Sequence, residues 1–362
     1  MGAPRLLLTG CGSPASQNLL QCLRLAPEPF YIVGTDASLH HLEWGELDVA
    51  YQAPLTSDPD YLEFLLGLCE AERIDFLHGQ PDWEVAFLSA HRERLPAATF
   101  LPRPRAICSA QDKFASACVW WHGELRLDPP IFIREGSDLE EAAEALGLPF
   151  WLRATTGAGA RGSCRVVSPE QGGAWVDYWR LSGSTWDFFA QAYLPGREYA
   201  FQSLWQEGEL ITSCARERLE FVFPQHAPSG ITSTPVIARS VQEEAVNRIA
   251  TAAILALDPR PHGIYGVDLK CDAKGHPRPT EINAGRFFTT SLFLAAAGCN
   301  LPYVYVCLGL GRAAPSLPRY DAIPADLYWI RHIDCGQVLV REGNWRGRRV
   351  EQAAPALMGS PA

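Results

Sequence analysis

Two carboxylates and a carboxamide, Asp268, Glu281 and Asn283, lie close together in the second half of the chain. Around them, apolar and polar residues alternate from 266 to 272, and an extended pattern resumes from 279 to 283, which predicts two strands. Between the strands, Lys274-Gly275 fits a tight turn. Counting outward from that turn places Asp268 directly opposite Glu281, with Asn283 two residues further on the same face.

This arrangement favours the binding of a divalent cation. Two carboxylates that face each other across a strand pair repel, and a bound cation reverses the sign of that interaction. Oxygen ligands from Asp, Glu and Asn suit Mg²⁺, which commonly combines a few carboxylates with nucleotide phosphates. Mn²⁺ is an alternative ion. Taken alone, the hairpin also fits a solvated face whose charges happen to align.

A glycine-rich segment, residues 155–162, joins two predicted strands further upstream. It lacks the Gly-Lys-Ser/Thr sequence and the following helix of a Walker loop. Small residues allow backbone N–H groups to approach phosphate oxygens, so we expect a flap that folds over phosphates. The residues expected near the phosphates are Gly157, Gly159, Arg161 and Gly162 in the loop, Arg153 just before it, and Lys113 at the start of a helix.

Composition limits the class of protein. A chain of 362 residues predicts two or three domains or subdomains. Its net charge of -10, without runs of like charge, argues against a general nucleic-acid binder. The eleven cysteines are scattered and odd in number, and no Cys/His pairs have zinc-ligand spacing, which predicts reduced thiols in a cytoplasm. We also expect neither a signal peptide nor a membrane span.

The elements that must position these residues follow from hydrophobic periodicity. Strands at 6–9, 30–34 and 75–78 alternate with helices at 15–25, 60–72 and 83–92, which is typical of an α/β sheet domain. Strands at 131–134, 150–154, 163–167, 186–193 and 198–205 are then expected to form two small antiparallel sheets. Helical spacing from Ser240 to Leu257 predicts an amphipathic helix. A last strand pair is expected at 327–332 and 337–341.

Four motifs in this order resemble the ATP-grasp superfamily, and within it short proteins similar to one half of a carbamoyl phosphate synthase large chain. The resemblance covers roughly residues 1–312. The motifs are Asp112-Lys113, residues 150–153 with their glycine loop, residues 191–199 (Gln-Ala-Tyr-Leu-Pro-Gly-Arg-Glu-Tyr), and Glu281-Ile282-Asn283.

The resemblance implies a mixed α/β and α+β fold, in which an N-terminal Rossmann-like pre-ATP-grasp domain precedes a two-subdomain ATP-grasp fold. The expected division is 1–104 for the first domain, 105–195 for the small subdomain with the flap, 196–312 for the large subdomain with the hairpin, and 313–362 for a C-terminal extension. The implied activity is ATP-dependent ligation of a small carboxylic acid to an amine through an acyl phosphate. A homodimer is left open.

The resemblance also assigns roles to single residues. Gln191, Ala192, Tyr193 and Leu194 would receive adenine, Glu198 the ribose, Lys113 and Arg153 the phosphates, and Asp268, Glu281 and Asn283 the Mg²⁺. Arg286 would face the acyl phosphate, with Arg153 as its partner in catalysis. Two departures stand out: Ala192 replaces an acidic hinge residue, and Arg286 follows one residue later than in the common form of the motif. A single ATP-grasp unit without a glutaminase domain counts against complete carbamoyl phosphate synthesis.

Other functions fit parts of the sequence. Gly10-Cys11-Gly12 follows a strand and opens a helix, and Asp36 closes the next strand, as in an NAD(P)-dependent oxidoreductase. In the ligase interpretation, Gly12 and Ser13 would instead receive a substrate anion at the helix N-terminus. A non-catalytic ATP-binding module is the third interpretation. The residues proposed to line the acceptor site are Arg216, Arg218, His226 and Ser229.

Overall fold

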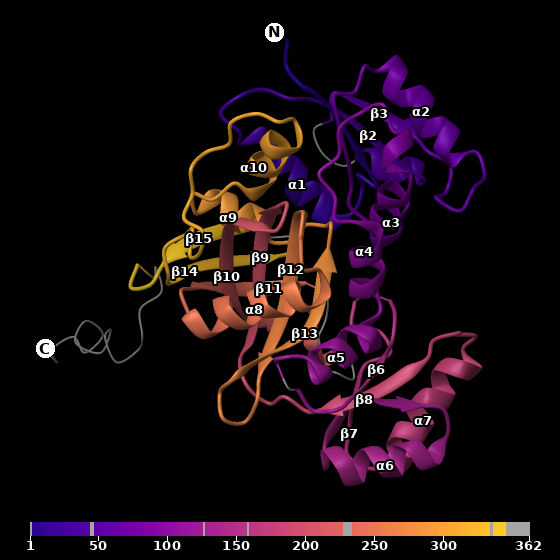
Figure 1. The fold of residues 1–362 in the computed structure, drawn as a ribbon. Coiled ribbons are helices and arrows are strands. Elements are labelled where there is room, and N and C mark those ends of the chain that lie inside the picture. The colour runs from indigo at the N-terminus through magenta and orange to yellow at the C-terminus, as the bar shows by residue number, and fades with distance from the viewer. Residues whose placement is uncertain are drawn as a thin grey trace, which may run out of the picture.

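The computed structural model describes residues 2–43, 47–125, 127–157, 159–226, 234–333 and 336–344. The strands of these described residues form three sheets (Figure 1). Within the described residues, no helix is both long and apolar enough to cross a membrane.

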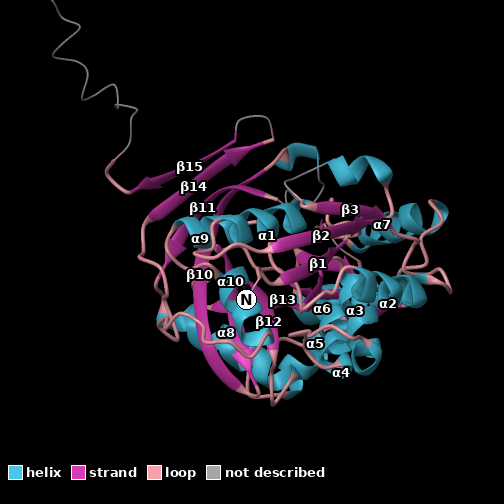
Figure 2. Cartoon of the chain, turned by 90° about the horizontal axis from the view of Figure 1, so that it is seen from above, coloured by secondary structure: helices cyan, strands magenta, loops and turns pink. Residues whose placement is uncertain are grey.

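The first sheet is parallel, with strand order β3-β2-β1-β4. Its central strands are buried and apolar because helices cover them, as parallel sheets require. The elements are β1 (Arg5–Thr9), α1 (Pro14–Arg24), β2 (Tyr31–Asp36), η1 (Leu39–Glu43), β3 (Val49–Gln52), α2 (Tyr61–Ala71), β4 (Phe76–Gly79), α3 (Asp82–His91) and η2 (Arg92–Arg94). Seen from above, β1 to β3 lie side by side, with α2 and α3 to one side of them (Figure 2).

The second sheet is small and antiparallel, with order β5-β8-β6-β7. Two helices pack on it and close a separate apolar core, and two others connect it to the first sheet (Figure 1). The elements are α4 (Pro104–Gln111), α5 (Lys113–His122), β5 (Ile131–Ile133), α6 (Gly136–Leu146), β6 (Phe150–Ala154), β7 (Cys164–Val166), α7 (Pro169–Leu181) and β8 (Phe188–Ala192).

The third sheet has seven antiparallel strands, in the order β13-β12-β9-β10-β11-β14-β15. Helix α8 packs against β9, β12 and β13, while α9 and α10 contact α1, which connects β1 and β2 of the first sheet. The elements are β9 (Glu198–Gln206), β10 (Glu209–Phe221), η3 (Pro224–His226), β11 (Pro235–Val241), α8 (Glu244–Leu257), β12 (Gly263–Cys271), β13 (Pro277–Ala284), α9 (Ser291–Ala296), α10 (Leu301–Gly309), β14 (Leu327–His332) and β15 (Gly336–Arg341).

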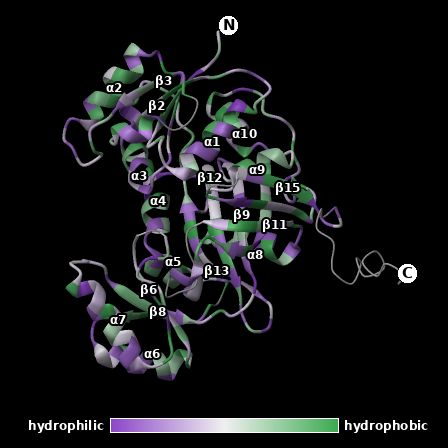
Figure 3. Cartoon of the chain, turned by 180° about the vertical axis from the view of Figure 1, so that it is seen from behind, coloured by the Kyte–Doolittle hydropathy of each residue, from purple (hydrophilic) through white to green (hydrophobic). Residues whose placement is uncertain are grey.

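Two expectations need correction. The strand at 198–205 belongs to this large sheet, not to a small one, because it pairs with both β10 and β12. The segment 235–241 is strand β11, so the predicted helix starts only at Glu244. Strand β3 and helices α4, α9 and α10 gave no sequence signal that we recognised. In Figure 3, helices such as α2 and α8 alternate between hydrophobic and hydrophilic residues, and this periodicity is the signal from which they were predicted.

Candidate active site

The β12–β13 hairpin has the expected register at its functional end, with Asp268 opposite Glu281 and Gly266 opposite Asn283. The loop differs from the expectation. The N–H of Asp272 donates to the carbonyl of His276, which leaves three loop residues, and Gly275 adopts a φ of 84° that favours glycine. Between Leu269 and Asp268 the register shifts by one residue, and this β-bulge restores the predicted pairing.

The bulge has a consequence for the site. The extra residue, Thr280, has no partner in the ladder, so its backbone carbonyl is free to accept a hydrogen bond from Nη1 of Arg153 at 2.8 Å. Its hydroxyl donates to the carbonyl of Asp268 at 3.0 Å and closes the bulge. The third sheet therefore holds Arg153, which belongs to the second sheet.

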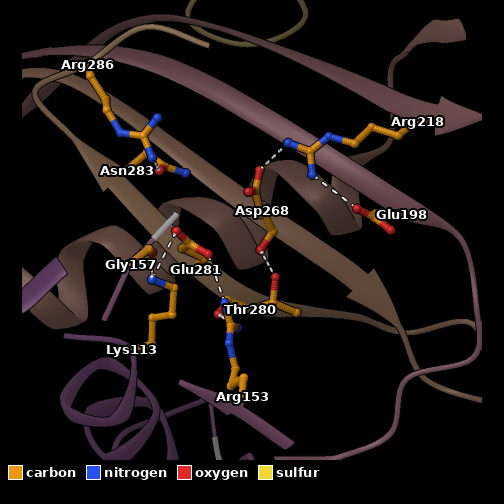
Figure 4. A network of polar contacts seen from close by, with 10 residues as sticks. All are labelled: Lys113, Arg153, Gly157, Glu198, Arg218, Asp268, Thr280, Glu281, Asn283 and Arg286. Atoms are coloured by element: carbon orange, nitrogen blue, oxygen red, sulfur yellow. Dashed lines mark hydrogen bonds and ion pairs between the residues drawn. The ribbon is translucent and has the colours of Figure 1, made fainter. Parts of the chain in front are cut away.

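The acidic side chains lie among cations (Figure 4). Glu281 pairs with Nη2 of Arg153 at 2.9 Å and with Nζ of Lys113 at 3.6 Å. Burial acts to raise the pKa of Glu281, but the positive charges around it, Lys113 first among them, outweigh burial and lower the pKa. Burial raises the pKa of Asp268 even though Nη2 of Arg218 lies 2.6 Å from its carboxylate.

Glu198 lies at the other end of the same charged row. Arg218 bridges it to Asp268, with Nη1 of Arg218 3.2 Å from the Glu198 carboxylate. Lys270 lies 3.5 Å from the second carboxylate oxygen. Glu198 is therefore held in place by two cations from neighbouring strands.

Lys113 connects the flap to this cluster. It begins α5 directly after Asp112, whose side chain caps the helix by accepting from the N–H of Ala115. Its Nζ donates to the carbonyl of Gly157 at 2.6 Å. Burial lowers the pKa of Lys113, against the opposing charge of Glu281.

The flap between β6 and β7 requires glycine. Gly157, Gly159 and Gly162 have φ values of 97°, 75° and 75°, which side chains disfavour. The Arg161 guanidinium lies over the Trp186 ring, 5.5 Å from its centre. Of the loop residues, Gly159 and Ala160 line the cavity described next.

A cavity of about 230 Å³ lies between the second and third sheets. The segment Gln191–Leu194 and Arg216 on β10 both line it. The lining residues are Trp151, Arg153, Gly159, Ala160, Ser163, Gln191, Ala192, Tyr193, Leu194, Glu198, Arg216, Arg218, Phe221, Pro235, Asp268, Lys270, Thr280, Glu281, Asn283, Arg286, Phe288 and Thr289. Acidic, basic and apolar groups thus share one concave space of the kind that binds small molecules.

Arg286 lines the cavity although it follows Asn283 one residue later than in the common form of the motif. Gly285 takes a φ of 83°, and the chain turns there so that the Arg286 guanidinium donates to the Asn283 carboxamide. Its Nε lies 2.5 Å from the carboxylate of Asp82, at the start of α3, the helix that follows β4 of the first sheet. Arg286 therefore links the cavity to the elements of the first sheet.

Gly12, Ser13 and His226, which were also predicted, do not line the cavity. The N–H of Gly12 donates to the carboxylate of Asp36 at 3.1 Å, and the Ser13 side chain caps α1, so neither lines the cavity. His226 is exposed in a short 3₁₀ turn and does not line it either. Ser229 lies outside the described residues.

Sequence reasoning missed Lys270 and Phe288 as cavity residues. Lys270 stands two positions after Asp268 on a strand, so the alternation already placed it on the same face. Phe288 gave no such signal. Its ring lies against Gly266, where an added Cβ would come within 2.5 Å of the ring, and this contact depends on the path of the chain after Arg286.

Solved structures provide the comparison for this fold and cavity. An L-amino acid ligase from Bacillus licheniformis is 14% identical over 91% of this chain and 79% of its own, with a TM-score of 0.65. N5-carboxyaminoimidazole synthetase from Staphylococcus aureus is 14% identical over 91% of this chain and 84% of its own, with a TM-score of 0.65.

A third structure is the biotin carboxylase domain of a Hydrogenobacter thermophilus 2-oxoglutarate carboxylase, in complex with MgADP, ADP and bicarbonate. It is 15% identical over 90% of this chain and 73% of its own, with a TM-score of 0.66. No family model and no curated protein matches the sequence. The similar structures are ATP-grasp enzymes, so this chain has the ATP-grasp fold.

Proposed function

We propose that this protein is an ATP-dependent ligase that joins a small carboxylic acid to an amine through an acyl phosphate, with conversion of ATP to ADP and phosphate. The observation that carries the proposal is the register of Asp268 opposite Glu281, in a cavity that also contains Arg153 and Arg286. The two facing carboxylates would repel each other, and in this structure Lys113, Arg153 and Arg218 offset their charge. Mg²⁺ on the carboxylates and a triphosphate on the basic side chains would replace these pairings.

The donor set fits Mg²⁺. Two carboxylates and the Asn283 carboxamide supply oxygen ligands from one face of the hairpin. Within the described residues, no group of three or more His, Cys, Asp or Glu side chains could hold a metal ion. In this proposal, nucleotide phosphates and water would complete the coordination. When bound, Mg²⁺ (or Mn²⁺) neutralises phosphate charge that develops during transfer.

The nucleotide would lie along the cavity from the hinge to the flap. Gln191, Ala192, Tyr193 and Leu194 would contact adenine, and Ala192 could do so only through its backbone. Glu198, fixed by Arg218 and Lys270, would accept from the ribose hydroxyls. Lys113 and Arg153 would exchange Glu281 for the phosphates, because the metal ion would compete for that carboxylate. The glycine loop would cover the phosphates.

The reaction would proceed in two displacements. A carboxylate oxygen of the acid attacks the γ-phosphorus in line, and the bond to the β–γ bridging oxygen breaks, giving ADP and an acyl phosphate. The amine nitrogen then attacks the acyl carbon, the C–N bond forms, and phosphate leaves while the amine loses a proton to solvent. Arg286, beside Asn283, would stabilise the negative oxygens in both steps.

We further propose that residues 1–104 form the Rossmann-like pre-ATP-grasp domain, and that 105–195 and 196–312 are the two subdomains that grip the nucleotide, followed by the extension from 313. A homodimer and a cytoplasmic location are compatible with this proposal. The oxidoreductase alternative has less support, because Asp36 already occupies the N–H of Gly12, which a dinucleotide would need.

The test is ADP formation. Purified protein with ATP, Mg²⁺, pooled carboxylic acids and pooled amines should release ADP and phosphate in equal amounts. Release of AMP and pyrophosphate would contradict the acyl-phosphate route. Tight ATP binding without turnover across a broad panel would favour the non-catalytic module.

A further inference from the structure

Arg216 is a charged residue of the cavity to which the proposed reaction gives no role. Its side chain lies on β10, is only 1% exposed, and lines the cavity. Its Nε and Nη1 atoms are buried without a hydrogen-bond partner in the described part of the chain. The other basic residues of the cavity wall all have a described partner: Arg153, Arg218, Lys270 and Arg286.

The sheet register fixes where this charge lies. Glu281, Asp268, Ala200 and Arg216 are successive partners across β13, β12, β9 and β10, so they share one face of the sheet. Neighbouring strands are about 4.8 Å apart, which puts the backbone of Arg216 roughly 10 Å from that of Asp268. Ala200, between them, adds only a methyl group. Arg216 therefore lies beyond the proposed metal ligands, away from the hairpin edge.

A buried guanidinium without a counter-ion costs free energy, because it has lost its water and gained no opposite charge. The ring of Phe288, 4.9 Å from the Arg216 guanidinium carbon, compensates only in part. Burial, followed by the charge of Arg218, lowers the pKa of Arg216 to about 9, so the group still carries its charge at neutral pH. An anionic ligand would supply the missing partner.

We propose that Arg216 binds a second anionic group of the acid substrate, distinct from the carboxylate that is activated. This assignment rests on the proposed ligase function, in which Arg286 and the metal ligands serve the reacting carboxylate. Phe221, Pro235 and Phe288 also line the cavity, and they suit a short aliphatic stem between the two charged ends. The substrate class is therefore a small acid with two anionic groups, the second a carboxylate or a phosphate.

The decisive experiment compares binding of matched acids by calorimetry in the presence of MgADP. The probes are butyrate, with one charge, succinate and glutarate, with two carboxylates, and 3-phosphoglycerate, with a carboxylate and a phosphate. We expect at least one dianionic acid to bind roughly 10- to 100-fold more tightly than butyrate, as loss of a charged hydrogen-bond pair would predict. Which dianionic acid binds identifies the second group.

Three variants assign the preference to the side chain. Arg216→Met should abolish the preference, and Arg216→Lys should keep part of it, because lysine retains the charge without the bidentate fork. Arg239→Gln is the matched control: Arg239 lies on the next strand, on the opposite face, paired with Glu217, and its loss should leave the preference unchanged.

Thermal unfolding without ligand provides a second measurement. Arg216→Met should melt no lower than the wild type, because it removes an uncompensated buried charge. If Arg216 instead stabilised the folded protein, the variant would melt at a lower temperature. Equal binding of all the acids by the wild type, binding of none, or an unchanged preference in Arg216→Met would overturn the proposal. ADP formation is measured separately, so failure of the ligase reaction and failure of this anion site give different results.

Discussion

Replacement of Glu281 by glutamine removes one charge and changes the side-chain volume very little. From the structure we expect this change to reduce both catalysis and stability. Glu281 is the proposed metal ligand that faces Asp268, and it is also the counter-ion of Lys113 and Arg153. The first role predicts loss of catalysis. The second predicts loss of stability before any ligand is added, because two cations are left buried without a carboxylate.

The magnitude of the stability effect follows from burial. The side chains of Lys113 and Arg153 are each 9% exposed and that of Glu281 is 21% exposed. Breaking a fully buried ion pair by removing one partner costs about 3–5 kcal/mol. Residual solvent at Glu281, and the hydrogen bond from Arg153 to the Thr280 carbonyl, reduce that figure, so we expect about 2–3 kcal/mol for Glu281→Gln.

Urea unfolding and ADP formation measure the two effects on the same samples. We expect a lower unfolding midpoint for Glu281→Gln and at least a roughly 100-fold loss of ADP formation. Adding Arg153→Met to Glu281→Gln should cost less stability than the single changes together, because the two residues interact directly. Wild-type stability together with wild-type ADP formation in Glu281→Gln would refute both the pairing and the metal assignment.

Three further changes test other parts of the structure. Burial lowers the pKa of His78 from 6.5 to about 4. As the pH falls, His78 is therefore protonated in the unfolded chain before it is protonated in the folded protein. The free energy of unfolding should decrease by about 3 kcal/mol from pH 6.5 to pH 4. Denaturant unfolding of His78→Gln across that range should show a shallower fall, and an equal slope would contradict this. Gly266→Ala should displace Phe288, whose ring lies 2.5 Å from the added Cβ, and raise the KM for the acid more than that for ATP; equal rises would count against the assignment. Gly162→Ala, at a φ of 75°, should cost about 1–2 kcal/mol in the flap and weaken ATP binding in titrations, and unchanged ATP affinity would separate the flap from the phosphates.

The register of the β12–β13 hairpin was predicted correctly at the acidic pair and incorrectly at the loop. Counting from Lys274-Gly275 paired Asp268 with Glu281, and the structure confirms that pair. The count was wrong by one residue at the loop and was restored by the bulge at Thr280. A bulge depends on local hydrogen bonding of a single residue, and alternation of side chains does not reveal it.

The buried helices show a different limit. Helix α10 is apolar on nearly all sides because it packs between the large sheet and α1, so it lacks the one-sided periodicity that identifies a surface helix. Strand β11 was not predicted for another reason. Its C-terminal residues continue the helical spacing of α8, and they form a strand only because they pair with β10 and β14.

The sequence by itself determined the local chemistry: the acidic pair on one face of the hairpin, the glycines that the flap requires, the capped start of α5 at Lys113, and the motif order that resembles ATP-grasp enzymes. These features depend on neighbours in the chain or on strand alternation. The tertiary structure alone decided which charges meet. It placed Arg153 against the Thr280 bulge, tied Arg286 to Asp82, removed Gly12 from the site, and left Arg216 buried without a counter-ion, because each of these outcomes depends on groups brought together from distant parts of the chain.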